Sequence, residues 1–459
     1  MSNDYAPVAK DKLIYFGTRR TKLGLITLFI FTVAVQVLVL QNNRTQIDSA
    51  LSVIQEQYRE NSAYLLRGEY RLFLFGPNPP SDANVLAHPP GYSVFDAIYH
   101  FVFGESADLR IAQILLMSLA PIVVWLIASE LVDPVAAWLA AVLTAVSPQF
   151  SYNALLMLPD GIAALIILLA IYCFVIAYKK ESLAATVLCA FFLGLSCWFR
   201  ANGILAPIFF AGAIFFLFSK KTRFRFAIIL LTVFLCVISP ITIRNYVGFG
   251  SVVPISLGIG LNLVEGIGDF DKEGRFQMPA TDAGVQELES ISLGCPDCRK
   301  TVYGGNGVER ERIRKQLAMS VIWSNPVWFG GVVLRRGASF FRFERVPAIS
   351  DNNDLSTGPF YYLNIPLKFF QKAFITAVFL PLLIGGVILM IRIPSERAKL
   401  VILLLIPFYY ICIHSWIHTE YRYILAMQPL FLLISSVALS WLIRLMLKAM
   451  NGARLAGTK

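Results

Sequence analysis

The sequence predicts an all-α integral membrane protein with about ten transmembrane helices and two large external segments. Of the 459 residues, 57% are hydrophobic and only 15% are charged, whereas an average soluble chain is about 45–50% apolar and about 25% charged. The mean hydropathy is +0.64, and the apolar residues form blocks long enough to cross a bilayer. A soluble globular enzyme is therefore excluded.

The ten expected spans follow from these apolar blocks, and the order of the spans is better determined than their ends. Several blocks lie near the lower length limit for a spanning helix, so the count is bracketed at about nine to eleven. They are Leu23–Leu40, Ile111–Ala128, Val135–Phe150, Ile162–Tyr178, Leu183–Phe199, Ile204–Ser219, Phe226–Ile243, Ala373–Ile393, Leu400–Ile413 and Ile424–Met446.

Basic residues between the spans predict the orientation of the chain. The net charge of +11 arises largely from clusters at the N-terminus, at Lys179–Lys180, at 220–225, at 392–399 and in the C-terminal tail. The positive-inside rule places these clusters and both termini on the cytoplasmic side, with no nucleic-acid partner implied. The first span lacks a cleavage site of small residues and is expected to be a retained helix. The compact loops favour a multi-pass protein of the plasma (inner) membrane, and a placement in the endoplasmic reticulum stays open.

This topology divides the chain into five parts. They are a cytoplasmic segment 1–22, a catalytic core 23–243 that includes the first external segment 41–110, a second external segment 244–372, C-terminal helices 373–446 and a cytoplasmic tail 447–459. In the second external segment the polar, Gly-rich stretch 269–307 is expected to be loop, and 308–324 and 327–341 have helical apolar spacing. Cys295 and Cys298 form an isolated pair, which favours a local disulfide over zinc, because a structural zinc site needs a second pair.

Polar residues that border the spans gather on the predicted external side. The first external segment begins with an amphipathic helix that carries Asp48, Glu56 and Glu60 and is expected to lie along the membrane surface. His88 follows, and the two prolines after it fix the backbone. Such a histidine either caps a turn or donates to an anion.

A carboxylate and several arginines lie at the same predicted external level. Asp160 follows Pro159 in the first turn of a span, where it is either an ordinary N-cap or part of a site. Arg200, Arg244 and Arg422 each lie at the end of a span. An interfacial arginine often extends to lipid headgroups, but three of them on one face with histidines favour a shared anionic ligand, because guanidinium binds phosphate bidentately.

These residue types fit transfer of a group from a lipid-phosphate carrier to a hydroxyl. A carboxylate takes the acceptor proton, and the bases neutralise the charge that builds on the departing phosphate. The phosphate is a good leaving group, so no general acid is required, in contrast to glycoside hydrolysis.

The layout resembles the GT-C superfamily of polyprenyl-phosphate-sugar-dependent glycosyltransferases, with the protein O-mannosyltransferase and lipid A aminoarabinose transferase types as the nearest branches. The similarity extends from about Gln41 to Pro429. The order and common sidedness of the motifs carry it, since each motif is short. They are the acidic helix after the first span, His88-Pro89-Pro90, Leu158-Pro159-Asp160, Arg200, Ile243-Arg244-Asn245-Tyr246 and the stretch from His418 to Tyr423.

The resemblance implies roles for particular residues. Asp160 is expected to organise the active site, and His88, Arg200, Arg244, His418 and Arg422 are expected to face the donor phosphate or nearby lipid groups. Relatives usually carry a catalytic Asp four residues before the Tyr of the first external helix. Here Ile54 precedes Tyr58 at that spacing, so Glu56 is the nearest acidic substitute, with Asp48 and Glu60 behind it.

The expected function is transfer of a monosaccharide from a polyprenyl-phosphate carrier to a hydroxyl of a lipid, glycan or protein acceptor on the external face, with inversion. The second external segment is expected to shape acceptor choice. Some relatives bind a divalent metal and others do not, so no metal is assigned. Two alternatives stay open. One is a lipid or solute transporter or flippase, although the spans carry almost no charge. The other is a non-catalytic assembly protein, which Ile54 keeps open.

Overall fold

The computed structural model describes residues 19–69, 83–304, 306–342, 365, 369 and 376–456, and these residues form helices and connecting loops without a strand. The predicted N-terminal residues 1–18, the tail beyond 456 and much of 343–375 lie outside the described residues. The main helices are α2 (Arg19–Asn42), α3 (Arg44–Ser49), α4 (Ser52–Leu66), α5 (Gly91–Phe103), α6 (Leu109–Met117), α7 (Ala120–Leu131), α8 (Pro134–Val146), α9 (Pro148–Leu155), α10 (Asp160–Lys180), α11 (Leu183–Phe199), α12 (Ala206–Leu217), α13 (Arg223–Phe249), α14 (Ile259–Gly268), α15 (Asp282–Ser292), α16 (Gly307–Ser324), α17 (Pro326–Ser339), α19 (Thr376–Arg392), α20 (Pro394–His414) and α21 (Met427–Ala456).

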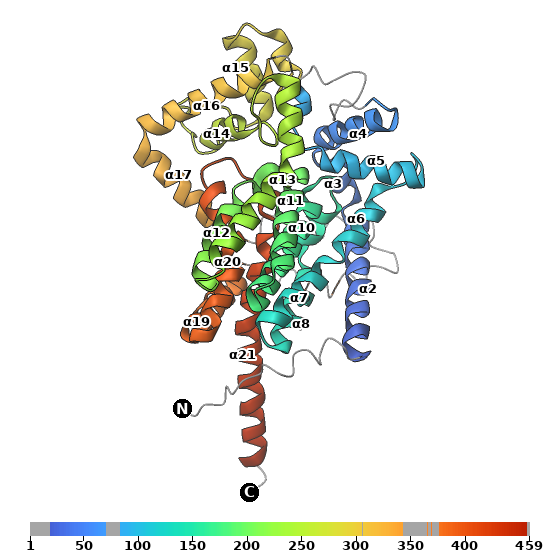
Figure 1. Ribbon diagram of the computed structural model, residues 1–459, viewed down its shortest axis with the longest axis vertical. Helices are drawn as coiled ribbons and strands as arrows, with labels where there is room; N and C mark the ends of the chain where they lie inside the picture. The colour runs from blue at the N-terminus through green and yellow to red at the C-terminus, as the bar shows by residue number, and fades with distance from the viewer. Residues whose placement is uncertain are drawn as a thin grey trace.

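The helices form a long bundle, and we call the helices at one end of it, α14–α17 together with α4 and α5, the cap (Figure 1). At the other end, α21 extends beyond the bundle (Figure 1). Four 3-10 helices complete the described elements: η1 (Ala83–Leu86), η2 (Ala201–Gly203), η3 (Pro296–Arg299) and η4 (Tyr421–Ile424). The η2 and η4 turns lie in short connections between helices of the bundle, so that they join neighbouring helix ends.

The predicted class of all-α membrane protein is confirmed, whereas the count of ten spans is not. Each predicted apolar block contains a helix, but only six helices among the described residues are long and apolar enough to cross a membrane. The number rises to eight if two bent pairs are each counted as one span. The helices Leu183–Phe199, Ala201–Leu217 and Ala377–Arg392 are apolar but shorter.

Local sequence explains where predicted helices break. The block expected as Val135–Phe150 is divided into α8 and α9, which are bent by 50° at Ser147. Pro148 causes the break, because proline disfavours helical backbone at the preceding residue, and Ser147 then caps α9 by accepting from the Phe150 amide. The amphipathic helix of the first external segment is likewise divided into α3 and α4 at Leu51, which has a φ of 54°.

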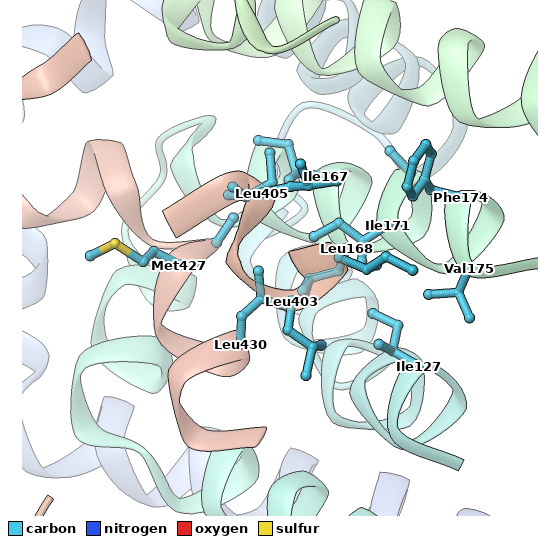
Figure 2. Packing of buried hydrophobic residues seen from close by; sticks show 14 of the residues in the cluster. Ile127, Ile167, Leu168, Ile171, Phe174, Val175, Leu403, Leu405, Met427 and Leu430 are labelled. Carbon is cyan, nitrogen blue, oxygen red and sulfur yellow. The ribbon is translucent and has the colours of Figure 1, made fainter. Parts of the chain in front are cut away.

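The core of the bundle surrounds α10. In the most apolar window of α10, 72% of the residues are buried, compared with 28% for α2, so α10 is central and α2 peripheral. A helix that is apolar on all sides fits such a position. Figure 2 shows Ile167, Leu168 and Ile171 of α10 packed with neighbours from α7, α20 and α21. The central helix therefore holds its first residue, Asp160, in a fixed position at the capped end.

The cap contains a helix where loop was expected. Residues 269–307 include α15 and the η3 turn, and the structure joins Cys295 to Cys298 by a disulfide, as the sequence predicted. The helix begins at Thr281, whose side chain accepts from the Gly284 amide. The sequence of this helix is polar, and one of its charged residues, Glu289, is only 6% exposed. The prediction of loop for this stretch is therefore wrong, because tertiary ion pairs stabilise a helix that lacks a strong apolar pattern.

Glu289 holds α15 against α16 through two arginines. Arg310 donates from Nε and Nη2 to Glu289 Oε2 at 2.9 and 2.6 Å, and Arg314 donates from Nε to Oε1 at 2.6 Å. Both arginines are nearly fully buried. Glu289→Gln is expected to lower the free energy of unfolding by about 3–5 kcal/mol, because removal of one partner leaves the charge of the buried arginines uncompensated. Thermal unfolding in nanodiscs measures the change.

The matched control is Glu287→Gln. Glu287 pairs with Arg299 at 2.6 Å, but both side chains are more than half exposed, and such pairs contribute about 0–1 kcal/mol. Equal melting temperatures for the two variants would contradict a stabilising role for the buried network.

Candidate functional site

The candidate site begins at the first residue of α10. Asp160 is 3% exposed, and its Oδ1 lies 3.0 Å from Arg200 Nε while its Oδ2 lies 3.9 Å from Arg422 Nη1. The N-cap of α10 is Pro159, which has no side-chain cap, and neither Asp160 oxygen has an aligned hydrogen-bond donor. Asp160 is thus not an ordinary N-cap. It is a buried carboxylate between two guanidinium groups, and both of its oxygens can still accept hydrogen bonds.

Three distant segments bring these charges together. Arg200 follows the last residue of α11, which packs antiparallel to α10 after a tight connection at Glu181. Arg422 lies in η4, the turn between α20 and α21 that contacts α10. Because short connections place neighbouring helix ends at the same level, the end of α11 and the start of α21 both meet the start of α10.

The guanidinium of Arg422 is fixed on one side and available on the other. Its Nε and Nη2 donate to the two carboxylate oxygens of Glu420 at 2.7 and 2.8 Å. Burial alone would raise the pKa of Glu420, but its hydrogen bonds with Arg422 lower it. The third nitrogen, Nη1, is buried without a hydrogen-bond acceptor. Arg422 therefore presents a donor toward Asp160 from a rigid position.

Tyr423 forms a platform for both arginines. The ring centroid of Tyr423 is 4.2 Å from Cζ of Arg200 and 4.9 Å from Cζ of Arg422. Cation–π contacts of this kind hold a guanidinium plane in place while leaving its edge free to donate. A small recess opens beside these groups, and its lining residues are Asp160, Ala163, Ala164, Ile167, Arg200, Asn202, Tyr410, Arg422, Tyr423, Leu425 and Ala426.

Aromatic residues from the first external segment close one side of the cluster. Tyr58 of α4 stacks on His88 with ring centroids 4.7 Å apart and meets Tyr92 edge-on at 5.1 Å. Burial raises the pKa of Tyr58, and the positive charge of Arg200 opposes the rise. Tyr58 thus lies within the field of Arg200 and Asp160.

His88 lies close to both arginines but is uncharged near neutral pH. Burial, together with the charges of Arg200 and Arg422, lowers the pKa of His88 to about 3. Its Nε2 lies 2.9 Å from Gln57 Oε1, which accepts if that nitrogen carries the proton. His88 can therefore serve as a neutral polar group at the site.

A glycine explains how the first external segment reaches Arg200. A Cβ atom at Gly91 would lie 2.5 Å from the carbonyl oxygen of Trp198, so only glycine permits the start of α5 to press against the end of α11. The next residue, Tyr92, donates to Gln113 Oε1 at 2.7 Å, and Gln113 donates to the Leu156 carbonyl at 2.8 Å. These bonds tie the segment after His88 to the chain that leads into Asp160.

The acidic residues predicted on the first external helix lie elsewhere. Glu56 and Glu60 are exposed on α4, and neither lines the recess. Asp48 pairs with Arg110 at 2.5 Å, also away from the lining residues. Ile54, one turn before the buried Tyr58, packs against an apolar cluster. The buried residues of α4 are Gln55, Tyr58 and Ser62, and its acidic positions fall on other sides of the helix.

Two other predicted phosphate-binding residues also lie outside the recess. Arg244 is buried in α13, where it donates to Asn245 Oδ1 from Nε at 2.9 Å and from Nη2 at 2.6 Å. His418 Nδ1 lies 2.8 Å from Asp269 Oδ2 of the cap, and the His418 amide donates to the Asn262 carbonyl at 2.7 Å. The structure therefore brings together Asp160, Arg200, Arg422 and His88 from the predicted set.

One acidic residue of the cap is buried. Glu265 of α14 is 6% exposed, and burial, the neighbouring Asp282 and the charges of Asp269 and Glu420 raise its pKa to about 9. Glu265 is therefore protonated near neutral pH and shares a hydrogen bond with Asp282.

This proton makes the stability of the cap pH-dependent. The pKa of Glu265 is higher in the folded state than its ordinary value of 4.5, so the folded state binds more protons between those two values. The free energy of unfolding is then expected to fall as pH rises from about 4.5 to about 9. Glu265→Gln, which keeps a donor for Asp282, is expected to flatten this slope in melting curves recorded from pH 5 to 9. An unchanged slope would contradict the shared proton.

Several site residues were not predicted. Tyr410 and Tyr423 line the recess, and Glu420 fixes Arg422. The motif from His418 to Tyr423 contained Glu420 and Tyr423, so a local signal existed for them. Tyr410 lies within an apolar span, and no sequence pattern distinguishes it from a core residue.

One family model matches part of the chain. A family model for dolichyl-phosphate-mannose-protein mannosyltransferase matches residues 87–243, about a third of the chain, and this range includes His88, Asp160 and Arg200. A comparison with curated proteins by sequence finds no match.

Solved structures show the same fold. The archaeal oligosaccharyltransferase AglB from Archaeoglobus fulgidus, in complex with an inhibitory peptide and a dolichol-phosphate, aligns with a TM-score of 0.52 at 16% identity over 95% of this chain and 52% of that chain. The same oligosaccharyltransferase tethered to an acceptor peptide aligns with a TM-score of 0.50 at 16% identity over 91% of this chain and 49% of that chain. This chain spans about half the length of those structures.

A third structure is less similar. ArnT from Cupriavidus metallidurans bound to undecaprenyl phosphate aligns with a TM-score of 0.34 at 17% identity over 83% of this chain and 72% of that chain, too low to support an argument. The family model and the AglB alignments confirm the resemblance to the GT-C glycosyltransferases that the sequence predicted. The chain has a GT-C-like fold and is a multi-pass membrane protein.

Proposed function

We propose that this GT-C-like chain transfers a monosaccharide from a polyprenyl-phosphate carrier to a hydroxyl of a lipid, glycan or protein acceptor, with inversion at the sugar carbon. The observation that carries the proposal is the buried group of Asp160, Arg200 and Arg422, in which a carboxylate and a guanidinium nitrogen both retain unused hydrogen-bonding capacity. The family match and the dolichol-phosphate bound to the archaeal oligosaccharyltransferase support a carrier of this class.

The arginines suit the departing phosphate. As the glycosidic bond breaks, negative charge grows on the phosphate oxygens, and Nη1 of Arg422 and the guanidinium of Arg200 are placed to stabilise it. Charge stabilisation in a buried site is effective because water is excluded and the donors are already oriented. Tyr423 and Glu420 hold the two guanidinium groups, so little reorganisation is needed when the charge appears.

Asp160 is the proposed general base for the acceptor hydroxyl. It is the only carboxylate that lines the recess within the described residues, and its unused oxygen positions can accept the hydroxyl proton as the oxygen attacks the sugar. His88 and Tyr58 supply neutral polar and aromatic surface beside it, which suits a sugar ring more than a second charge. Among the described parts of the chain, no group of three or more His, Cys, Asp or Glu is placed to hold a metal ion.

The proposed orientation follows from charge. The site lies at the capped end of the bundle (Figure 1), and the basic clusters that predict the cytoplasmic side fall mainly in the connections at the other end. The active site is then on the external face, with both termini cytoplasmic. The second external segment supplies α14–α17 at this end, and its proposed role is to select the acceptor.

A specific observation favours a second candidate, a non-catalytic assembly protein of the same fold. Ile54 packs into an apolar cluster one turn before Tyr58, at the position where the resemblance implies a catalytic Asp. The two candidates differ in one measurement. Purified protein in nanodiscs receives a panel of polyprenyl-phosphate monosaccharides with crude envelope acceptors, and free polyprenyl phosphate is quantified. Release from one donor supports the transferase, and no release from any donor by folded protein supports the assembly role.

A further inference from the structure

The corner between α16 and α17 exposes large apolar side chains at the capped end. Trp323 at the end of α16 is 74% exposed, and Val327 and Leu334 on α17 are 89% and 75% exposed. Val327 and Leu334 are seven residues apart, so they lie on one face of α17, opposite the buried Phe329, Val332 and Arg336. We refer to Trp323, Val327 and Leu334 as the apolar elbow. Figure 1 shows α16 and α17 meeting at the outer edge of the molecule.

The elbow is not part of a spanning helix. Taken together, the two helices are long and apolar enough to cross a membrane, but they are bent by 106° relative to each other. The first half of α16 carries charged residues, two of which, Arg310 and Arg314, are locked to Glu289 in the cap. A segment fixed in this way cannot enter the bilayer core, and its apolar side chains still need a partner other than water.

The inner face of α17 fixes the height of the elbow. The ring of Phe329 lies 5.5 Å from that of Trp416, and Arg336 donates from Nη1 to the Ser415 carbonyl at 3.2 Å. Ser415 and Trp416 directly follow α20, which ends at His414 and is one of the spanning helices. Because the chain leaves the bilayer at this point, α17 lies at the level of the lipid headgroups.

Both the spanning helix α20 and the elbow expose large apolar side chains. Val401 and Phe408 are exposed on α20, seven residues apart on one face, and Trp416, just beyond the end of the helix, is 51% exposed. On a membrane protein such exposed apolar side chains face lipid chains. Trp416 contacts the buried face of α17 through Phe329, so α17 lies beside the lipid-facing end of α20 with the elbow on its outer face. Tryptophan at the border is typical of the membrane interface.

We propose that the apolar elbow is a lipid-binding surface that seats the cap in the headgroup region of the bilayer. The side chains of Trp323, Val327 and Leu334 insert among the lipids beside the end of α20, while the charged part of α16 stays in water. This attachment fixes the cap, and with it α14 and the His418–Asp269 contact, relative to the membrane plane. The inference does not depend on the proposed transferase activity.

Nitroxide labels in nanodiscs test the proposal. The background carries Cys236→Ala and Cys412→Ala, since these free cysteines are exposed or partly exposed. Labels are introduced through Trp323→Cys, Val327→Cys and Leu334→Cys, with Phe408→Cys as the reference for lipid and Lys272→Cys, on an exposed polar turn of the cap, as the reference for water. Power-saturation spectra compare collision with oxygen, which partitions into lipid, and with a nickel chelate, which stays in water.

The expected result is that the three elbow labels collide more with oxygen than with the nickel chelate, as at Phe408, although less strongly because they lie nearer the headgroups. The label at Lys272 should show the opposite order. Elbow labels that match Lys272 would overturn the proposal. Labels shielded from both reagents would also overturn it, because they would indicate a protein partner at this surface. All labelled positions are exposed, so the substitutions are expected to leave the fold intact. Unchanged size-exclusion profiles verify this.

Discussion

Asp160→Asn is expected to reduce release of polyprenyl phosphate by about 10²–10⁴-fold, the range associated with loss of a positioned general base. The substitution keeps the shape of the side chain but removes the charge that faces Arg200 and Arg422. The neutral amide of the variant can neither take the acceptor proton nor balance the charge of the two guanidinium groups. The measurement is kcat for carrier release by protein in nanodiscs, with the melting temperature as a check of folding.

The acidic residues of the first external segment provide the contrast. Glu56→Gln, Glu60→Gln and Asp48→Asn are expected to change the rate by less than about threefold, since these side chains do not line the recess and exposed charges contribute little. Glu309→Gln, at an exposed surface pair with Arg312, is the neutral control. A rate lost in Glu56→Gln and retained in Asp160→Asn would place the base on α4 and contradict the assignment.

Arg422→Gln is expected to weaken binding of polyprenyl phosphate by about 10–100-fold, because a hydrogen bond to a charged group contributes about 1.5–3 kcal/mol. The loss comes from the buried Nη1, which has no acceptor of its own, and from the positive charge above Tyr423. Arg422→Lys is expected to recover only part of the affinity, since an ammonium cannot keep both bonds to Glu420 while donating to phosphate. Titration of polyprenyl phosphate measures the dissociation constant.

The matched control lies at the other end of the same helix region. Arg444 of α21 pairs with Asp133 and is about half exposed, and it is roughly 25 Å along the helix from the residues of α21 nearest the recess. Arg444→Gln should leave the dissociation constant unchanged. Equal weakening in both arginine variants would indicate a general effect of charge on the lipid ligand, and the specific role of Arg422 would be wrong.

The candidate site was partly predictable from local sequence. Asp160, Arg200 and Arg422 each border a helix of the bundle, and charged residues at such positions are rare enough to be noticed without a structure. His88 was noticeable because of the prolines beside it. Their assembly was not predictable in the same way, since residues 160, 200 and 422 meet only because α11 packs on α10, η4 packs on α10 and Tyr423 of η4 contacts Arg200. Tyr410 carried no signal at all, because an aromatic residue in an apolar span is usually core.

The sequence by itself determined the membrane class, the order of the helices and the local disulfide between Cys295 and Cys298. These features depend on hydropathy and on spacing within one segment, so they are local. The tertiary structure alone decided that α15 is a helix, that Glu56 and Glu60 face solvent while Tyr58 faces Arg200, and that Asp160 rather than a residue of α4 is the carboxylate in the recess. Those outcomes depend on which helix faces are buried against one another, and packing between distant segments sets that choice.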